Sequence, residues 1–98
     1  MKLSVKQIYD TWTCLNGSTI RCDGWIKTIR ASSSIGFIEL NDGTSFKNIQ
    51  IVVDKNKVNN YNEIAKLNIY SAIQIEGVLK LTPQMPQPFE IHANSIEL

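Results

Sequence analysis

The stretch Ile35-Gly36-Phe37-Ile38-Glu39-Leu40-Asn41-Asp42-Gly43 decides the fold of this 98-residue chain. Its residues alternate between two faces at a period of two, which is typical of a strand with one buried side, and the final Asp-Gly marks a turn. We expect Ile38 and Leu40 to point inward and Phe37 and Glu39 to point outward. If the strand is shifted by one residue, the faces exchange and Phe37 becomes a core residue instead.

Two further segments alternate in the same way on either side of this strand. Residues 19–30 form one of them, and Gly24 within it suggests a bulge or bend. Residues 49–53 form the other, with isoleucine and valine on the inner face and Gln50 outward. We therefore expect Gln50 to share the outer surface of the sheet with Phe37.

The C-terminal part of the chain predicts two more strands, separated by a proline-rich loop. Residues 72–81 alternate, and residues 82–88 contain all three prolines, which indicates a stiff exposed loop. Residues 89–94 alternate again and form the last strand. Glu90 and His92 are expected to point outward from it.

Helical spacing appears in two segments. Residues 4–12 begin with Ser4 and Gln7 at the spacing of a capping box, and residues 59–69 follow the third strand. An all-β fold with five strands, a short helix between strands three and four and an extra N-terminal helix matches the OB-fold barrel. Because one domain usually has about 100–150 residues, we expect a single domain over residues 1–98.

Composition limits the possible functions. The chain has 10 basic and 9 acidic residues, so we do not expect sequence-independent electrostatic binding of polyanions. Any nucleic-acid site must be confined to one part of the surface. No apolar stretch approaches the ~20 residues of a membrane helix, and no secretory signal is apparent, so we expect a cytoplasmic protein with reduced thiols. Cys14, Cys22 and His92 are the only soft metal ligands, and no catalytic motif is present. We expect neither a metal site nor a catalytic site.

Four residues on the expected outer face suit the recognition of unpaired bases. Phe37 can stack on a base, whatever its identity. Gln50 offers a donor and an acceptor to a pyrimidine edge, and Arg30 can reach a base or a phosphate. The carboxylate of Glu90 only accepts hydrogen bonds, and guanine presents adjacent N–H donors, so this residue favours guanine over adenine.

These residues also have simpler interpretations. Taken singly, Arg30, Gln50 and Glu90 are ordinary solvated positions. A general single-strand binder or a protein-interaction OB module is the alternative function. A general binder usually carries several outward aromatic residues and a basic groove, whereas this face offers chiefly Phe37 and Trp25.

Three segments carry a resemblance to a known family: Gly24-Trp25-Ile26, residues 37–46 and residues 48–53. They resemble the N-terminal anticodon-binding domain of class II aminoacyl-tRNA synthetases of the aspartyl, asparaginyl and lysyl group. Residues 41–48 and the ending Gln87-Pro88-Phe89-Glu90-Ile91 are most similar to the asparaginyl-tRNA synthetases. The likeness covers nearly the whole chain.

The resemblance implies that Phe37 stacks on the central anticodon uridine, that Gln50 and Arg30 contact this uridine, and that Glu90 reads the first-position guanine. It implies the tRNA for asparagine as partner. It also implies a homodimeric parent enzyme whose catalytic domain, with ATP and magnesium, lies outside this chain. Lys27-Thr28-Ile29-Arg30 stands where aspartyl enzymes carry a run of arginines, which argues against an aspartyl assignment.

Overall fold

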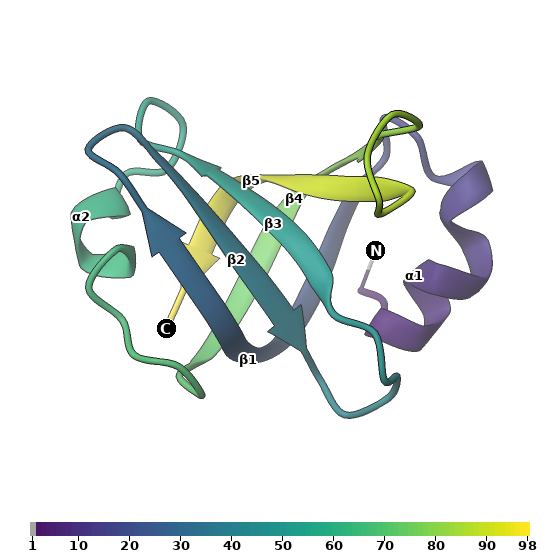
Figure 1. Ribbon diagram of the computed structural model, residues 1–98, viewed down its shortest axis with the longest axis horizontal. Helices are drawn as coiled ribbons and strands as arrows, with labels where there is room; N and C mark the ends of the chain where they lie inside the picture. Colours follow the sequence, from purple (N-terminus) through teal and green to yellow (C-terminus); the bar gives the residue numbers. More distant parts are fainter. Residues whose placement is uncertain (1) are drawn as a thin grey trace.

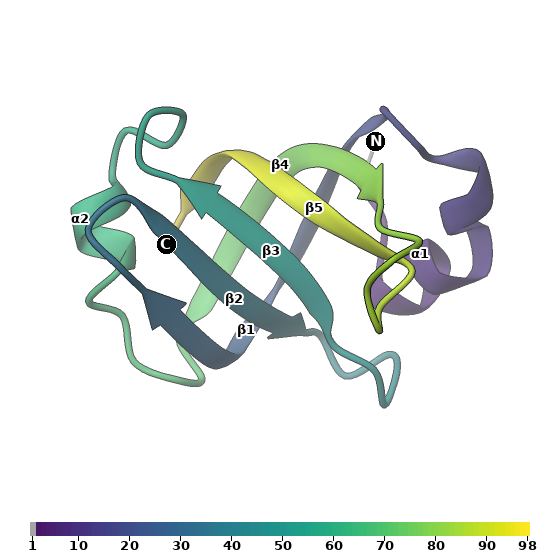
Figure 2. The same ribbon diagram turned by 45° about the horizontal axis from the view of Figure 1, so that its top comes forward.

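The computed structural model describes residues 2–98, and their strands close into a barrel (Figures 1 and 2). The strands are β1 (Thr19–Ala31), β2 (Ile35–Asn41), β3 (Ile49–Asp54), β4 (Ala72–Leu81) and β5 (Phe89–Glu97). Their order around the barrel is β1-β2-β3-β5-β4. Neighbouring strands are antiparallel except β3 and β5, which are parallel. This arrangement confirms the predicted five-stranded OB-fold.

The inward side chains of the strands fill the barrel with one apolar core. On β2, Ile38 is 1% exposed and Leu40 is fully buried. On β3, Ile49 and Ile51 are also fully buried. The predicted register is therefore confirmed, and Phe37 lies outside the core.

Gly24 allows two strands to approach closely. A Cβ atom at this position would lie 2.5 Å from the backbone carbonyl oxygen of Asn41, which is too close for any side chain. Of the predicted bulge or bend at Gly24, the bulge is absent, because Gly24 keeps its regular pairing with β4. The irregularity of β1 lies instead between Ile26 and Thr28, where the pairing with β2 shifts.

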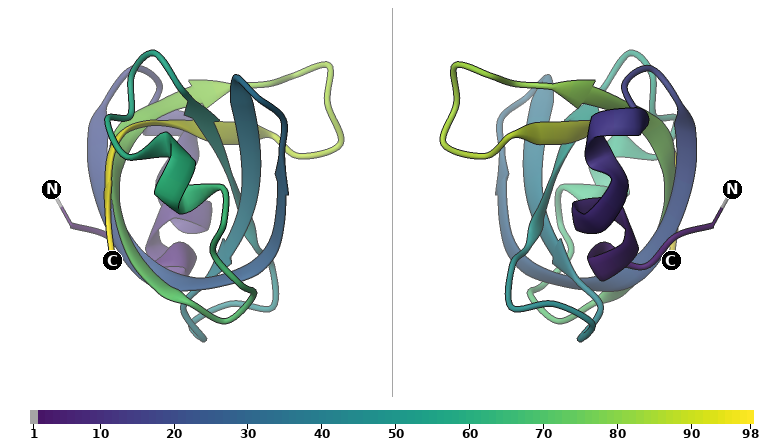
Figure 3. Two further views of the ribbon diagram at one scale, coloured as in Figure 1. Left: turned by 90° about the vertical axis from the view of Figure 1, so that its left-hand side faces the viewer. Right: turned by 90° about the vertical axis from the view of Figure 1, so that its right-hand side faces the viewer.

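Short helices close the two ends of the barrel (Figure 3). Helix α1 (Val5–Thr11) and the 3-10 turn η1 (Trp12–Cys14) lie at one end, and α2 (Tyr61–Ile64) lies at the other. Val5 and Ile8 of α1 are fully buried. The ring of Trp12 stacks on Phe89 with the ring centres 6.0 Å apart.

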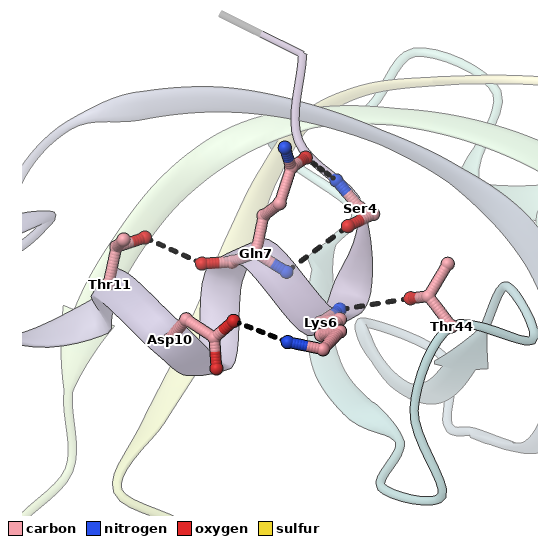
Figure 4. A network of polar contacts seen from close by, with 6 residues as sticks. All are labelled: Ser4, Lys6, Gln7, Asp10, Thr11 and Thr44. Carbon is pink, nitrogen blue, oxygen red and sulfur yellow. Dashed lines mark hydrogen bonds and ion pairs between the residues drawn. The ribbon is translucent and has the colours of Figure 1, made fainter.

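The capping box predicted for the N-terminal helix is confirmed. The backbone amide of Gln7 donates to the hydroxyl of Ser4 at 3.1 Å, and the amide of Ser4 donates to the side-chain oxygen of Gln7 at 2.8 Å (Figure 4). These two bonds satisfy backbone donors that have no partner within the helix, so the helix begins at a defined residue.

The second helix is shorter than the predicted segment 59–69. Tyr61 and Ile64 are buried and cover the end of the barrel, as the spacing indicated. Beyond them the chain leaves the helix, because the backbone amide of Tyr70 donates to the carbonyl of Ile26 at 2.6 Å and Tyr70 itself has a φ of 67°. A contact with a distant strand thus ends a helix that local spacing would have continued.

The last strand is longer than the predicted segment 89–94. Ile96 is 3% exposed, and the pairing of β5 with β4 continues to Glu97. Residues 82–88 form the predicted surface loop, closed by a hydrogen bond from the amide of Thr82 to the carbonyl of Pro88.

Candidate nucleic-acid interface

The predicted site residues lie on β1, β2, β3 and β5, whose arrangement Figure 2 shows. The strand pairing places their side chains in two adjacent rows on the outer surface. In the first row, Arg30 pairs with Phe37, Phe37 pairs with Val52, and Val52 pairs with His92. Side chains directly opposite each other in neighbouring strands share a face of the sheet, so these four side chains are neighbours. The first row therefore joins Arg30 to Phe37, as expected from the sequence.

Phe37 is half-buried, with part of its ring open to solvent. The guanidinium carbon of Arg30 lies 5.7 Å from the centre of the ring. Together with the neighbouring loop, the two residues border a shallow hollow of about 290 Å³, lined by Arg30, Ala31, Ser32, Ile35 and Phe37. A partly exposed ring beside a cation suits the stacking of a base next to a phosphate.

The second row joins Gln50 to Glu90 across the parallel strands β3 and β5. The side-chain nitrogen of Gln50 donates a hydrogen bond to Oε2 of Glu90 at 3.2 Å. The other carboxylate oxygen, Oε1, lies 2.8 Å from Nε2 of His92. With 16% of its side chain exposed, the Glu90 carboxylate is held in place at both oxygens. Each oxygen retains acceptor capacity for a ligand.

Two loops extend the second row. The side-chain nitrogen of Asn48, in the loop between β2 and β3, donates to Oε2 of Glu39 at 3.0 Å. The loop between β4 and β5 contributes Gln87. A hollow of about 280 Å³ lies between these groups, lined by Glu39, Lys47, Asn48, Gln50 and Gln87. We call it the polar hollow.

Helix α1 fixes the loop that lines the polar hollow. The hydroxyl of Tyr9 donates to the backbone carbonyl of Asn48. Burial, and next the nearby Glu39 carboxylate, raise the pKa of Tyr9, so its hydroxyl remains a donor. The amide of Lys6 donates to the hydroxyl of Thr44 at 3.0 Å (Figure 4). The side chain of Lys47 lies over the Tyr9 ring, 5.2 Å from its centre.

Asp42, in the same loop, caps α1 from outside the helix. Its Oδ2 accepts from the amide of Val5 at 3.0 Å, and its Oδ1 accepts from the amide and the hydroxyl of Thr44 at 3.1 and 2.6 Å. Burial alone would raise the pKa of Asp42, but these hydrogen bonds from Thr44 and Val5 together lower it. The loop and the helix therefore stabilise each other.

The sequence analysis missed three contributors to the site. His92 was interpreted as an ordinary surface residue, but it contacts Glu90; the spacing of two residues on one strand face was the available signal. Asn48 and Gln87 lie outside the strands, and no periodicity points to them. The structure nevertheless brings together all four predicted residues, Arg30, Phe37, Gln50 and Glu90, on one surface.

The described residues contain no cluster of metal-ligating side chains. Between residues 2 and 98 there is no group of three or more His, Cys, Asp or Glu side chains placed to hold a metal ion. Cys14 is exposed, while burial, and next the charges of Asp23 and Asp42, raise the pKa of Cys22 to about 12. In the same span, no helix is long and apolar enough to cross a membrane.

Comparison with known families agrees with this geometry. Residues 20–98 match the family described as OB-fold nucleic acid binding domain, under the heading tRNA_anti-codon. The chain belongs to this family. The match covers all five strands of the OB-fold domain and each of Arg30, Phe37, Gln50 and Glu90.

Two relatives of this OB-fold domain are named asparagine–tRNA ligase. The domain is 54% identical over 96 residues to the asparagine–tRNA ligase of Alkaliphilus metalliredigens, and 53% identical over 94 residues to that of Clostridium acetobutylicum. These alignments cover 98% and 96% of the domain and 20% of each relative, so the chain spans about a fifth of their length. The predicted resemblance to asparaginyl-tRNA synthetases is thereby confirmed.

Solved structures give the same result. The asparaginyl-tRNA synthetase of Pyrococcus horikoshii, complexed with asparaginyl-adenylate, superposes on the OB-fold domain with a TM-score of 0.84 and 26% identity. The match covers 100% of the domain and 22% of that chain.

Proposed function

We propose that residues 1–98 act as one domain that binds the anticodon loop of the tRNA for asparagine. Phe37 stacks on the central uridine of the anticodon, and Gln50 and Arg30 contact the same nucleotide. Glu90 accepts hydrogen bonds from the first-position guanine. The domain thereby contributes to the selection of tRNA before asparagine is attached.

The observation that carries this proposal is the contact between Gln50 and Glu90 in the row next to Phe37. A stacking ring and a fixed pair of amide and carboxylate stand side by side on one surface. An unpaired uridine and the purine that precedes it meet complementary groups there, because bases splayed from a loop expose their Watson–Crick edges. The names of the relatives support the choice of asparagine.

The parent protein is proposed to be a cytoplasmic, homodimeric asparagine–tRNA ligase that uses ATP and magnesium. Its catalytic part would hold both cofactors and would lie outside these 98 residues. Within the part of the chain that the structure describes, no cluster of metal ligands fits magnesium. The residues described here supply binding and selection, and the chemistry belongs to the remainder of the parent.

A direct binding experiment tests the proposal. The domain is titrated with labelled RNA hairpins whose loops display GUU, AUU or an unrelated triplet, at one fixed salt concentration because phosphate contacts make affinity salt-dependent. We expect GUU to bind more tightly than both other loops. Equal affinity for all loops would instead support a general single-strand binder. No detectable binding to any loop would favour a protein-interaction module.

A further inference from the structure

We propose that Gln87 is a second specificity-determining residue for the first anticodon base, donating a hydrogen bond to O6 of guanine. The inference rests on the proposed function and goes beyond it, because the sequence patterns and the family resemblance gave Gln87 no role in reading the base. Two observations assign this role. Gln87 lines the polar hollow, and its side-chain nitrogen is buried without a hydrogen-bond partner.

Gln50 links Gln87 to Glu90. Gln50 lines the polar hollow together with Gln87, and its side-chain nitrogen donates a hydrogen bond to Glu90 at 3.2 Å. Gln87 also precedes Glu90 by three residues, at the end of the loop that leads into β5. A base that binds at Glu90 and Gln50 therefore borders the polar hollow that Gln87 lines.

The chemistry of guanine leaves one group without a partner at Glu90. Its Watson–Crick edge presents O6, N1–H and the 2-amino group in a row. The Glu90 carboxylate accepts from the two N–H groups, but it repels O6, because a carboxylate has no donor. A donor next to Glu90 is needed to satisfy O6, and the same donor rejects adenine, whose 6-amino group is itself a donor.

The other side-chain amides that line the polar hollow each already donate one hydrogen bond within the protein. The side-chain nitrogen of Gln50 donates to Glu90, and that of Asn48 donates to Glu39. Lys47 lies over the ring of Tyr9. Among residues 2–98, the side-chain nitrogen of Gln87 has no hydrogen-bond partner although it is buried from solvent.

A buried, unpartnered N–H group is costly, so a ligand that satisfies it gains free energy. The terminal torsion of glutamine is soft and roughly two-fold, and a half-turn about it exchanges the positions of the amide nitrogen and oxygen. Through this rotation, Gln87 can turn its nitrogen toward the hollow when a carbonyl oxygen arrives. Guanine O6 provides that acceptor.

The test replaces Gln87 by methionine, which has a similar length and no donor. Binding of the Gln87→Met domain is measured with hairpins that display GUU, AUU, or IUU, in which inosine keeps O6 and N1–H but lacks the 2-amino group. Gln84→Met is the matched control, because Gln84 lies exposed in the same loop. Thermal unfolding of each variant is recorded in parallel.

We expect Gln87→Met to weaken GUU and IUU equally, by about 2- to 13-fold, the equivalent of one neutral hydrogen bond. AUU binding should not weaken, and Gln84→Met should bind all three as the unaltered domain does. Glu90→Gln should behave differently and cost more with GUU than with IUU, because inosine offers this carboxylate one donor fewer. The melting temperature of Gln87→Met should not fall, since the replaced amide had no partner.

Three results would overturn the inference. In the first, Gln87→Met binds GUU as tightly as the unaltered domain does. In the second, it weakens GUU and AUU alike, as a purely structural role requires. If the unaltered domain prefers GUU over other loops in either case, the proposed function stands and only the role of Gln87 fails. If the unaltered domain shows no preference for GUU, both proposals fail together.

Discussion

Replacing Glu90 by glutamine should reduce the preference for guanine while leaving the fold intact. The two side chains have nearly the same shape, but one carboxylate oxygen becomes an N–H donor and the charge is lost. The neighbours of Glu90 tolerate this change. Gln50 can still donate to the remaining oxygen, and His92 can accept from the new amide through its other tautomer.

The expected magnitude follows from the hydrogen bonds at this carboxylate. Glu90 is 16% exposed, so its bonds to guanine are largely shielded from water. A hydrogen bond to a charged group contributes roughly 1.5–3 kcal/mol and a neutral one about 0.5–1.5 kcal/mol. One bond to guanine is lost and the other becomes neutral, so we expect GUU binding to weaken by about 2.5–4.5 kcal/mol, or about 60- to 1,600-fold. Adenine offers only one donor, so AUU should lose less.

Fluorescence anisotropy with the GUU and AUU hairpins at one salt concentration measures both affinities. The matched control is Glu76→Gln, which removes the same charge at an exposed position on β4. The control should leave both affinities nearly unchanged. An equal gain in affinity in the two variants would show that net charge governs binding, because each loses one negative charge. An unchanged GUU:AUU ratio in Glu90→Gln would refute direct reading of the base.

Three other predictions follow from the structure. Phe37→Ala should weaken binding of the GUU hairpin by about 1–3 kcal/mol, the value of one base stacked on an aromatic ring. A loss of about 3–5 kcal/mol in the free energy of urea unfolding would show that the ring belongs to the core instead. Gly24→Ala should lower that free energy by about 1–3 kcal/mol, because its Cβ would meet the Asn41 carbonyl at 2.5 Å. Gly36→Ala is its control, since a Cβ there has only ordinary contacts at 3.6 Å, and equal losses in the two would contradict the argument. The lowered pKa of Asp42 means that its stabilising contribution is complete above the unfolded value of about 3.9 and is lost as pH falls through the folded value. Urea midpoints from pH 6 to pH 2 should therefore fall less steeply in Asp42→Asn, and parallel curves would refute this assignment.

Local sequence patterns predicted most of the barrel, because the alternation that marks a strand involves only residues a few positions apart. The alternation around Ile38 and Leu40 was sufficient to place Phe37 on the outer surface. The capping box at Ser4 was sufficient to start α1. Long-range contacts were not predictable in this way. The early end of α2 depends on a bond between Tyr70 and Ile26, which no local spacing reveals.

The difference between local patterns and long-range contacts also explains which residues of the candidate site were predicted from the sequence. Arg30, Phe37, Gln50 and Glu90 were identified from strand faces and from the chemistry of their side chains. The contact between Gln50 and Glu90 could not be foreseen, because it depends on the parallel pairing of β3 with β5. Gln87 depends on how a proline-rich loop packs against its surroundings, for which the sequence offers no periodic signal.

The pairing of β3 with β5 also affects how the domain folds. Gln50 and Glu90 are 40 positions apart in the sequence, so the pairing of their strands closes a long segment of chain that contains β4. Closing so long a loop loses chain entropy before the stabilising contacts between the strands can form, so such pairings are late events in folding. The side chains of Gln50 and Glu90 thus meet only after β3 has paired with β5. During refolding from urea, RNA binding should therefore return in the last kinetic phase, after the hairpin of β2 and β3 has formed.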